Sequence, residues 1–173
     1  MTTANKLTIF RVVLIPVFLV LAYTGHLRWA LLVFVLASLS DMLDGYIARH
    51  YNQITNFGKF MDPLADKLLV CSTLVAMTAL GRTPAWAVII VIAREFAISG
   101  FRLLAVERGV VIAAGWSGKI KTTLQNIWCM GLLIPVTAAW WKTLTTIVMV
   151  LAVILTIYSF CEYLSKNSQV LKG

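Results

Sequence analysis

Four of the seven acidic residues of this chain fall within residues 40–67, inside two segments that are otherwise apolar enough for a membrane. They form two pairs, because Asp41 and Asp44 are three residues apart and Asp62 and Asp66 are four apart. On helices each pair shares a face, and like charges at these spacings repel each other. Only Lys59 stands three or four residues from one of these aspartates, so bound divalent cations are the expected balancing charge.

Carboxylate oxygens are hard ligands, which favour Mg²⁺ or Mn²⁺ over zinc. Two such ions held a few ångströms apart would bridge a diphosphate and neutralise a leaving oxygen. The alternative is a structural ion cluster or a divalent-cation transporter, whose aspartates would line a path through the membrane. All four aspartates are expected toward one membrane face, and the outer half of the membrane has no acidic partner for them, which argues against such a path.

The same stretch has the pattern D-x2-D-G-x2-A-R-x8-G-x3-D-x3-D, and no position departs from that of a known family. It resembles the CDP-alcohol phosphotransferases, with the pattern carried by Asp41, Asp44, Gly45, Ala48, Arg49, Gly58, Asp62 and Asp66. Members of that family transfer a phosphatidyl group from a CDP-linked lipid to an alcohol and release CMP. The resemblance implies a membrane enzyme with two Mg²⁺ or Mn²⁺ ions, acting as a homodimer.

The resemblance also implies roles for individual residues. Asp41, Asp44, Asp62 and Asp66 would hold the metals, and Asp66 would also take the proton of the acceptor hydroxyl. The CDP moiety would be bordered by Thr8, Gly45, Ala48, Arg49 and Gly58. The two glycines leave room for a bulky ligand beside the backbone, although helix packing alone can also require them.

The whole chain is most similar to a bacterial branch of the family that forms phosphatidylglycerol phosphate. SDMLDGYIAR, GKFMDPLADKLL, IAREFAISGFR and GKIKT occur there in the same order. The expected substrates are therefore CDP-diacylglycerol and sn-glycerol 3-phosphate, used at the cytoplasmic face of the bacterial inner membrane. Inositol phosphate, serine and phosphatidylglycerol remain alternative acceptors.

Composition independently indicates an integral membrane protein, in contact with membrane lipids. Of 173 residues, 60% are hydrophobic and 13% are charged, whereas soluble domains carry about 25% charged residues. Runs of about 20 apolar residues, each long enough to span a bilayer, can be placed six times. We therefore predict an all-α chain with one domain, residues 1–173, and six transmembrane helices at about Leu7–Thr24, Trp29–Arg49, Phe57–Leu80, Pro84–Val106, Lys119–Ala139 and Thr143–Leu164.

The basic residues predict the orientation of these spans. With both termini in the cytoplasm, eleven Lys and Arg fall on the inner side of the predicted topology, against Arg28, Arg82 and Lys142 on the outer side. This distribution follows the positive-inside tendency. The net charge of +8 is dispersed among apolar helices rather than gathered on a soluble face, so no nucleic-acid partner is expected.

A phosphorylated acceptor needs a second anion site, and four basic residues of the fourth and fifth spans can supply it: Arg94, Arg102, Lys119 and Lys121. Arginine grips phosphate with two parallel donors. Two alternatives stay open. Glu95 and Arg102 are seven residues apart and can form a structural ion pair, and the two lysines can serve only as membrane anchors.

At the start of the chain, Thr8 and Arg11 are three residues apart and can point into one site. Alternatively, Thr8 caps the helix and Arg11 extends its charge to water. The sixth span is apolar until Glu162 and is interpreted as scaffold.

Overall fold

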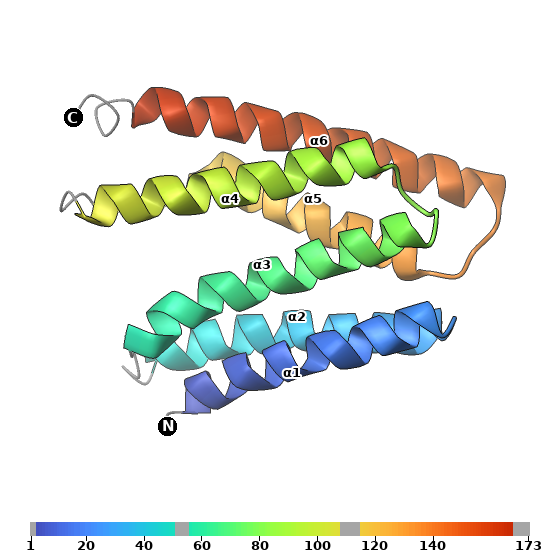
Figure 1. The fold of residues 1–173 in the computed structure, drawn as a ribbon, viewed down its shortest axis with the longest axis horizontal. Coiled ribbons are helices and arrows are strands. Elements are labelled where there is room, and N and C mark those ends of the chain that lie inside the picture. The colour runs from blue at the N-terminus through green and yellow to red at the C-terminus, as the bar shows by residue number, and fades with distance from the viewer. Residues whose placement is uncertain (1–2, 51–55, 108–114, 168–173) are drawn as a thin grey trace. The chain divides into compact units, whose positions relative to one another are not determined.

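The computed structural model describes the backbone of residues 3–50, 56–107 and 115–167, and the side chains of residues 7–40, 64–106 and 115–167. Within these ranges every regular element is a helix (Figure 1): α1 (Thr3–Tyr23), α2 (Leu27–His50), α3 (Asn56–Ala79), α4 (Ala85–Glu107), α5 (Trp116–Leu133) and α6 (Ala139–Lys166). The predicted all-α class is confirmed.

The helix ends follow the predicted spans closely except at α5. This helix ends at Leu133, six residues before the predicted end at Ala139. Pro135 explains the difference, because proline has no backbone N–H and disfavours helical geometry in the residue before it. The correct end was therefore visible in the sequence and was missed.

The chain divides into two compact units. The first comprises Met1–Thr83 and Cys129–Val136, and the second comprises Pro84–Trp128 and Thr137–Gly173. Helices α1, α2 and α3 belong to the first unit, and α4 and α6 belong to the second. Helix α5 contributes most of its length to the second unit and its last turn to the first.

In the first unit, α1 packs against both α2 and α3, and α2 also contacts α3. The buried positions of α1 recur every three or four residues and therefore form one helical face: Thr8, Arg11, Ile15, Phe18 and Ala22. Phe18 meets Phe34 of α2 with ring centroids 6.4 Å apart. This packing places the polar end of the α1 face, at Thr8 and Arg11, between two helices.

Tight turns end α1 and α3, and each uses a glycine in the left-handed region. Gly25 has φ +83° and Gly81 has φ +67°. After α1, His26 N–H donates to the carbonyl of Leu21 (2.9 Å) and Gly25 N–H to that of Ala22 (3.2 Å). This is the Schellman arrangement, and it makes α1 and α2 antiparallel neighbours.

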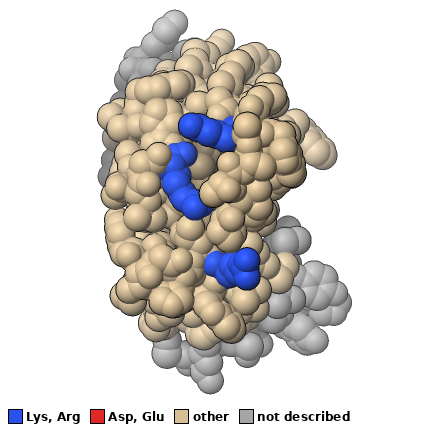
Figure 2. All heavy atoms as spheres, turned by 90° about the vertical axis from the view of Figure 1, so that its right-hand side faces the viewer, with Lys and Arg blue, Asp and Glu red and all other residues tan. Residues whose placement is uncertain are grey.

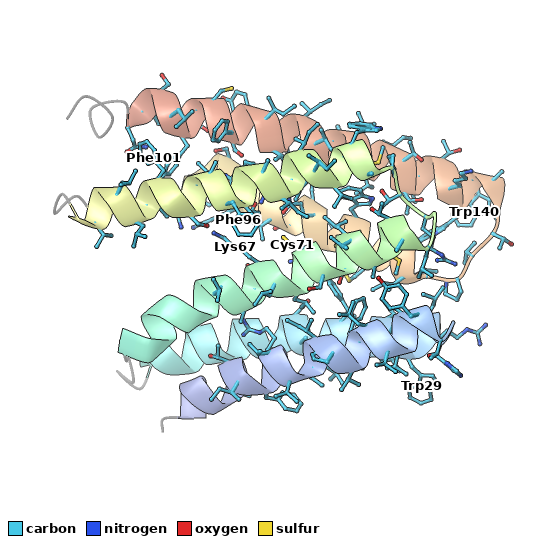
Figure 3. All side chains as sticks on the ribbon, in the orientation of Figure 1. Trp29, Lys67, Cys71, Phe96, Phe101 and Trp140 are labelled. Atoms are coloured by element: carbon cyan, nitrogen blue, oxygen red, sulfur yellow. The ribbon has the colours of Figure 1, made fainter. Side chains whose placement is uncertain are left out.

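In the second unit, α4 packs against α6. The buried face of α4 contains Val91, Glu95, Ile98, Phe101 and Ala105. Phe101 faces α6 (Figure 3), where its ring meets the ring of Tyr163 edge-on at 5.5 Å between centroids. A single acidic residue therefore occupies an otherwise apolar face of α4.

Among the described residues, α6 is the one helix that is long and apolar enough to cross a membrane by length and composition. Only 28% of its apolar window is buried, whereas a core helix of a soluble protein is mostly buried. Shorter apolar helical stretches occur at Leu7–Tyr23 and Leu27–Ser40. These features indicate a membrane protein; the prediction of six spans stays a prediction.

Large apolar and aromatic side chains are exposed on the other helices as well. On α1 they include Val13 (58% exposed) and Val20 (63%), and on α4 Phe96 (73%). Trp29 and Trp140, near the first residues of α2 and α6, are exposed too (Figure 3). Figure 2 shows the face that carries the α1–α2 and α3–α4 turns, where the charged side chains of the described residues are Lys and Arg.

Candidate active site

The two aspartate pairs lie on adjacent halves of two packed helices. Asp41 and Asp44 belong to the C-terminal part of α2, and Asp62 and Asp66 to the N-terminal part of α3. At 1.5 Å per residue, all four lie within about 15 Å of the helix ends that the α2–α3 connection joins. The backbone therefore brings both pairs to one end of the first unit (Figure 1), as their positions in the sequence predicted.

Most side chains of the predicted metal and CDP site lie outside the described residues. This applies to Asp41, Asp44, Gly45, Ala48, Arg49, Gly58 and Asp62. Asp66 is described and is partly buried, beside the fully buried Ala65. The donor set itself, four carboxylates on adjoining helix halves, fits a hard divalent cation such as Mg²⁺ or Mn²⁺.

The N-terminal end of α1 shares this end of the first unit, because α1 and α2 are antiparallel neighbours (Figure 1). Thr8 and Arg11 are both 0% exposed on the α1 face that packs against α2 and α3. The alternative that Arg11 extends to water is therefore wrong. A buried guanidinium is costly unless negative charge lies close by, which is consistent with a position beside the carboxylates or a bound diphosphate.

The second unit contains a buried ionic network centred on Glu95 of α4. Glu95 Oε1 accepts hydrogen bonds from Lys121 Nζ of α5 and from Arg94 Nη1, the latter at 3.3 Å. Lys121 is 2% exposed and Glu95 is 8% exposed. Arg94 also reaches α6, where its Nη2 donates to Ser159 Oγ at 3.2 Å. Three helices are joined by this network.

Arg102 lies outside the network and packs against an aromatic ring. Its guanidinium carbon is 5.9 Å from the centroid of the Tyr163 ring, within the range of a cation–π contact. The alternative ion pair between Glu95 and Arg102 is not formed, because Glu95 is occupied by Arg94 and Lys121 instead. Residues seven apart are separated by about 10 Å along a helix axis. Lys121 of α5 therefore comes closer to Glu95 than Arg102 does.

Further polar groups lie close to this network. Arg102 follows Arg94 by eight residues on α4, about 12 Å along the helix axis. The buried Nε atoms of both arginines, and the buried hydroxyl of Tyr163, have no hydrogen-bond partner among the described residues. Such donors can bind the oxygens of an anion.

Lys119 and Lys121 behave differently although they are two residues apart. Lys121 is buried against Glu95, whereas Lys119 is exposed with its Nζ 5.0 Å from the centroid of the Trp116 ring. Two residues rotate a helix by about 200°, so the two side chains point to opposite sides. Of the four predicted acceptor-binding residues, the structure brings Arg94 and Lys121 together, places Arg102 near them, and separates Lys119.

The interpretation of α6 as scaffold missed three polar residues. Ser159 contacts Arg94, Tyr163 lies beneath Arg102, and buried Thr156 accepts a hydrogen bond from Gln125 Nε2 of α5 at 3.3 Å. Their spacing of three and four residues places them on one face of α6. That spacing was the available signal in the sequence.

Comparisons with known proteins agree with the motif. Residues 1–158 match the family described as CDP-alcohol phosphatidyltransferase. A Bacillus subtilis protein named CDP-diacylglycerol–glycerol-3-phosphate 3-phosphatidyltransferase is 41% identical, over 97% of this chain and 96% of its own. A Salmonella typhimurium protein of the same name is 38% identical, over 92% and 91%. A probable phosphatidylglycerophosphate synthase of Mycobacterium tuberculosis is 35% identical, over 98% and 83%. The chain belongs to the CDP-alcohol phosphatidyltransferase family.

Proposed function

We propose that this protein transfers the phosphatidyl group of CDP-diacylglycerol to sn-glycerol 3-phosphate, giving phosphatidylglycerol phosphate and CMP. The observation that carries the proposal is the similarity over nearly the whole chain to relatives from three bacteria whose names state this activity or this product. The reaction belongs to phospholipid biosynthesis and makes the protein a transferase.

The charge of the buried ionic network together with Arg102 supports a phosphorylated acceptor. Arg94, Arg102 and Lys121 carry three positive charges against one negative charge on Glu95, which leaves +2. A phosphate monoester carries about −1.5 to −2 near neutral pH. Serine has no net charge and would leave these cations without a partner, and the phosphodiester of phosphatidylglycerol carries only one negative charge. Inositol phosphate has the same charge as glycerol 3-phosphate, and the names of the relatives favour the latter.

For the reacting centre, we propose that Asp41, Asp44, Asp62 and Asp66 hold two Mg²⁺ or Mn²⁺ ions. These ions would supply positive charge to the diphosphate and to the leaving CMP. Thr8, Gly45, Ala48, Arg49 and Gly58 would border the CDP moiety. The arrangement of α1, α2 and α3 supports this grouping, because the backbones that carry these residues share one end of the first unit.

Asp66 acts as the base in this proposal. Its carboxylate takes the proton of the acceptor hydroxyl as that oxygen attacks the phosphorus of the phosphatidyl group. A new O–P bond forms, and the P–O bond to CMP breaks. Arg94, Arg102 and Lys121 are the proposed contacts of the acceptor's phosphate. Lys119 would add to the positive field from a more exposed position.

We further propose a six-span protein of the bacterial inner membrane, with both termini and the active site in the cytoplasm. The exposed apolar side chains, the tryptophans near helix ends and the distribution of Lys and Arg support this placement. Assembly as a homodimer is proposed from family resemblance.

The test is product identification with purified full-length protein. CDP-diacylglycerol is offered with Mg²⁺ or Mn²⁺ and with glycerol 3-phosphate, inositol phosphate, serine or phosphatidylglycerol in turn. We expect phosphatidylglycerol phosphate and stoichiometric CMP from the first acceptor, and loss of both when a chelator removes the metal. Another lipid product would replace the proposed acceptor, and full activity in chelator would remove the metals from the proposal.

A further inference from the structure

Glu95 lies at the centre of the basic residues of the second unit, although it cannot itself bind an anion. One oxygen of its carboxylate accepts hydrogen bonds from two cations that belong to different helices, Arg94 of α4 and Lys121 of α5. All three side chains are largely withdrawn from water, with side-chain exposures of 12% for Arg94, 11% for Glu95 and 2% for Lys121. The carboxylate therefore holds the Arg94 guanidinium and the Lys121 ammonium in position.

The guanidinium of Arg94 is fixed on two sides. Nη1 donates to Glu95 and Nη2 donates to Ser159 of α6, so the orientation of the planar group is determined by two helices. Its buried Nε has no hydrogen-bond partner among the described residues. A guanidinium held in this way keeps a donor in a constant direction, which suits the recognition of a phosphate oxygen.

Without the carboxylate, Arg94 and Lys121 would repel each other in a region with little water to screen them. Both side chains would then take up new positions. Cations that are ordered before the substrate arrives lose no rotamer freedom on binding. The network thus converts two flexible cations into a preorganised pair.

We infer that Glu95 is a positioning residue for the acceptor's phosphate: it holds Arg94 and Lys121 in the places from which they contact that phosphate. The inference rests on the proposed function, because it assumes a phosphorylated acceptor at these cations. A carboxylate that only joined α4 to α5 would instead affect folding stability and both substrates alike.

The test compares Glu95→Gln and Glu95→Asp with the wild-type protein, all full-length and purified in detergent. Glu162→Gln is the matched control, because it removes a carboxylate from the exposed Glu162–Lys166 pair of α6 in the same unit. Four quantities are measured: KM for glycerol 3-phosphate, KM for CDP-diacylglycerol, the inhibition constant of inorganic phosphate competing with glycerol 3-phosphate, and the melting temperature.

We expect Glu95→Gln to raise the KM for glycerol 3-phosphate and the inhibition constant of phosphate together, by about tenfold or more, the loss expected for one charge-assisted contact. The KM for CDP-diacylglycerol should hardly change. Glu95→Asp keeps the charge but is shorter, so its values should fall between those of the wild type and Glu95→Gln. Glu162→Gln should match the wild type.

Equal changes for both substrates with a lower melting temperature would overturn the inference, as would an unchanged KM for glycerol 3-phosphate. If Glu95→Gln does not fold, Glu95→Asp decides by the same comparison of the two KM values. Wild-type protein that does not use glycerol 3-phosphate would overturn the proposed function and this inference together. Wild-type protein that uses glycerol 3-phosphate but is not inhibited by phosphate in competition with it would overturn this inference alone.

Discussion

At the scale of single residues, surroundings separate side chains that the sequence groups together. Lys119 and Lys121 have the same type and nearly the same position in the chain. One is exposed beside Trp116 and the other is buried against Glu95. A buried lysine paired with a carboxylate is tied to a defined position, whereas an exposed one is screened by water and salt. Their contributions to anion binding should differ accordingly.

The carboxylates of the first unit should divide into ligands alone and a ligand that also acts as base. Asp44→Asn should abolish transfer and weaken Mn²⁺ binding, because it removes a charged oxygen ligand. Asp66→Asn should lower kcat by about 10²- to 10⁴-fold, the usual contribution of a general base, while part of the Mn²⁺ binding survives. Turnover and calorimetric Mn²⁺ binding on the same preparations check both. Wild-type turnover in Asp66→Asn would exclude Asp66 from the chemistry.

Arg102 should act on the acceptor rather than on the lipid donor. Arg102→Ala should raise the KM for glycerol 3-phosphate through the loss of about 1.5 to 3 kcal/mol, roughly 10- to 150-fold, with the KM for CDP-diacylglycerol nearly unchanged. Arg102→Lys should recover only part of this, because an ammonium has no two-pronged grip.

Steady-state kinetics with each substrate varied in turn measures this prediction. Lys166→Gln is the control, since it removes an exposed cation of the same unit. If the guanidinium served only to pack on Tyr163, Arg102→Ala would lower the melting temperature and impair both substrates together.

The sequence was sufficient to predict that the four aspartates lie on two helices, because a helical repeat relates nearby positions directly. Spacing was not sufficient to predict the ion-pair partner of Glu95. Arg102 and Lys121 are both cations, and the choice between them as a partner depends on how α4 and α5 pack. No local pattern contains that information. Contacts between residues distant in the chain, such as Arg94 with Ser159, are unpredictable for the same reason.

At the scale of elements, two glycines in the left-handed region form the turns that end α1 and α3. Gly81 ends α3 with φ +67°, and Arg82 N–H donates to the carbonyl of Met77 at 2.9 Å. An added Cβ would meet no atom within 4 Å there. The cost of a side chain at this position is therefore purely one of backbone conformation.

Gly81→Ala should destabilise the protein by about 1 to 2 kcal/mol, the cost of the left-handed region for a residue with a Cβ. Gly100→Ala is the matched control, because Gly100 lies inside α4 and also has no atom within 4 Å of an added Cβ. It should stabilise the protein by about 0.5 to 1 kcal/mol, since glycine weakens a helix interior. Thermal unfolding in detergent measures both changes. Changes of the same sign would contradict the assignment.

At the scale of the whole molecule, the two parts of the proposed chemistry are divided between two compact units. The carboxylates and the buried end of α1 belong to the first, and the basic network belongs to the second. Helix α5 links them covalently, because Trp116–Trp128 lies in the second unit and Cys129–Leu133 in the first. Its ability to cross the membrane therefore bears on the entire topology.

Helix α5 is the shortest of the six helices that are predicted to span the membrane. Its 18 residues extend about 27 Å at 1.5 Å per residue, slightly less than a hydrocarbon core of about 30 Å, and Lys119 and Lys121 lie in its first turns. If all six helices cross, the residues that precede and follow α5 must lie on opposite sides. Gly109 should then be cytoplasmic and Thr137 external.

Labelling of single introduced cysteines tests whether successive connections lie on opposite sides of the membrane. The parent protein has its native Cys71, Cys129 and Cys161 replaced by serine. A membrane-impermeant maleimide applied to cells with a permeable outer envelope should label His26→Cys and Thr137→Cys, both at exposed positions. Gln53→Cys and Gly109→Cys should be labelled only after the inner membrane is opened. The excess of Lys and Arg in the predicted inner half requires this direction. Labelling of Gly109→Cys and Thr137→Cys from the same side would show that α5 does not cross, and would leave a chain with an odd number of spans and its termini on opposite faces.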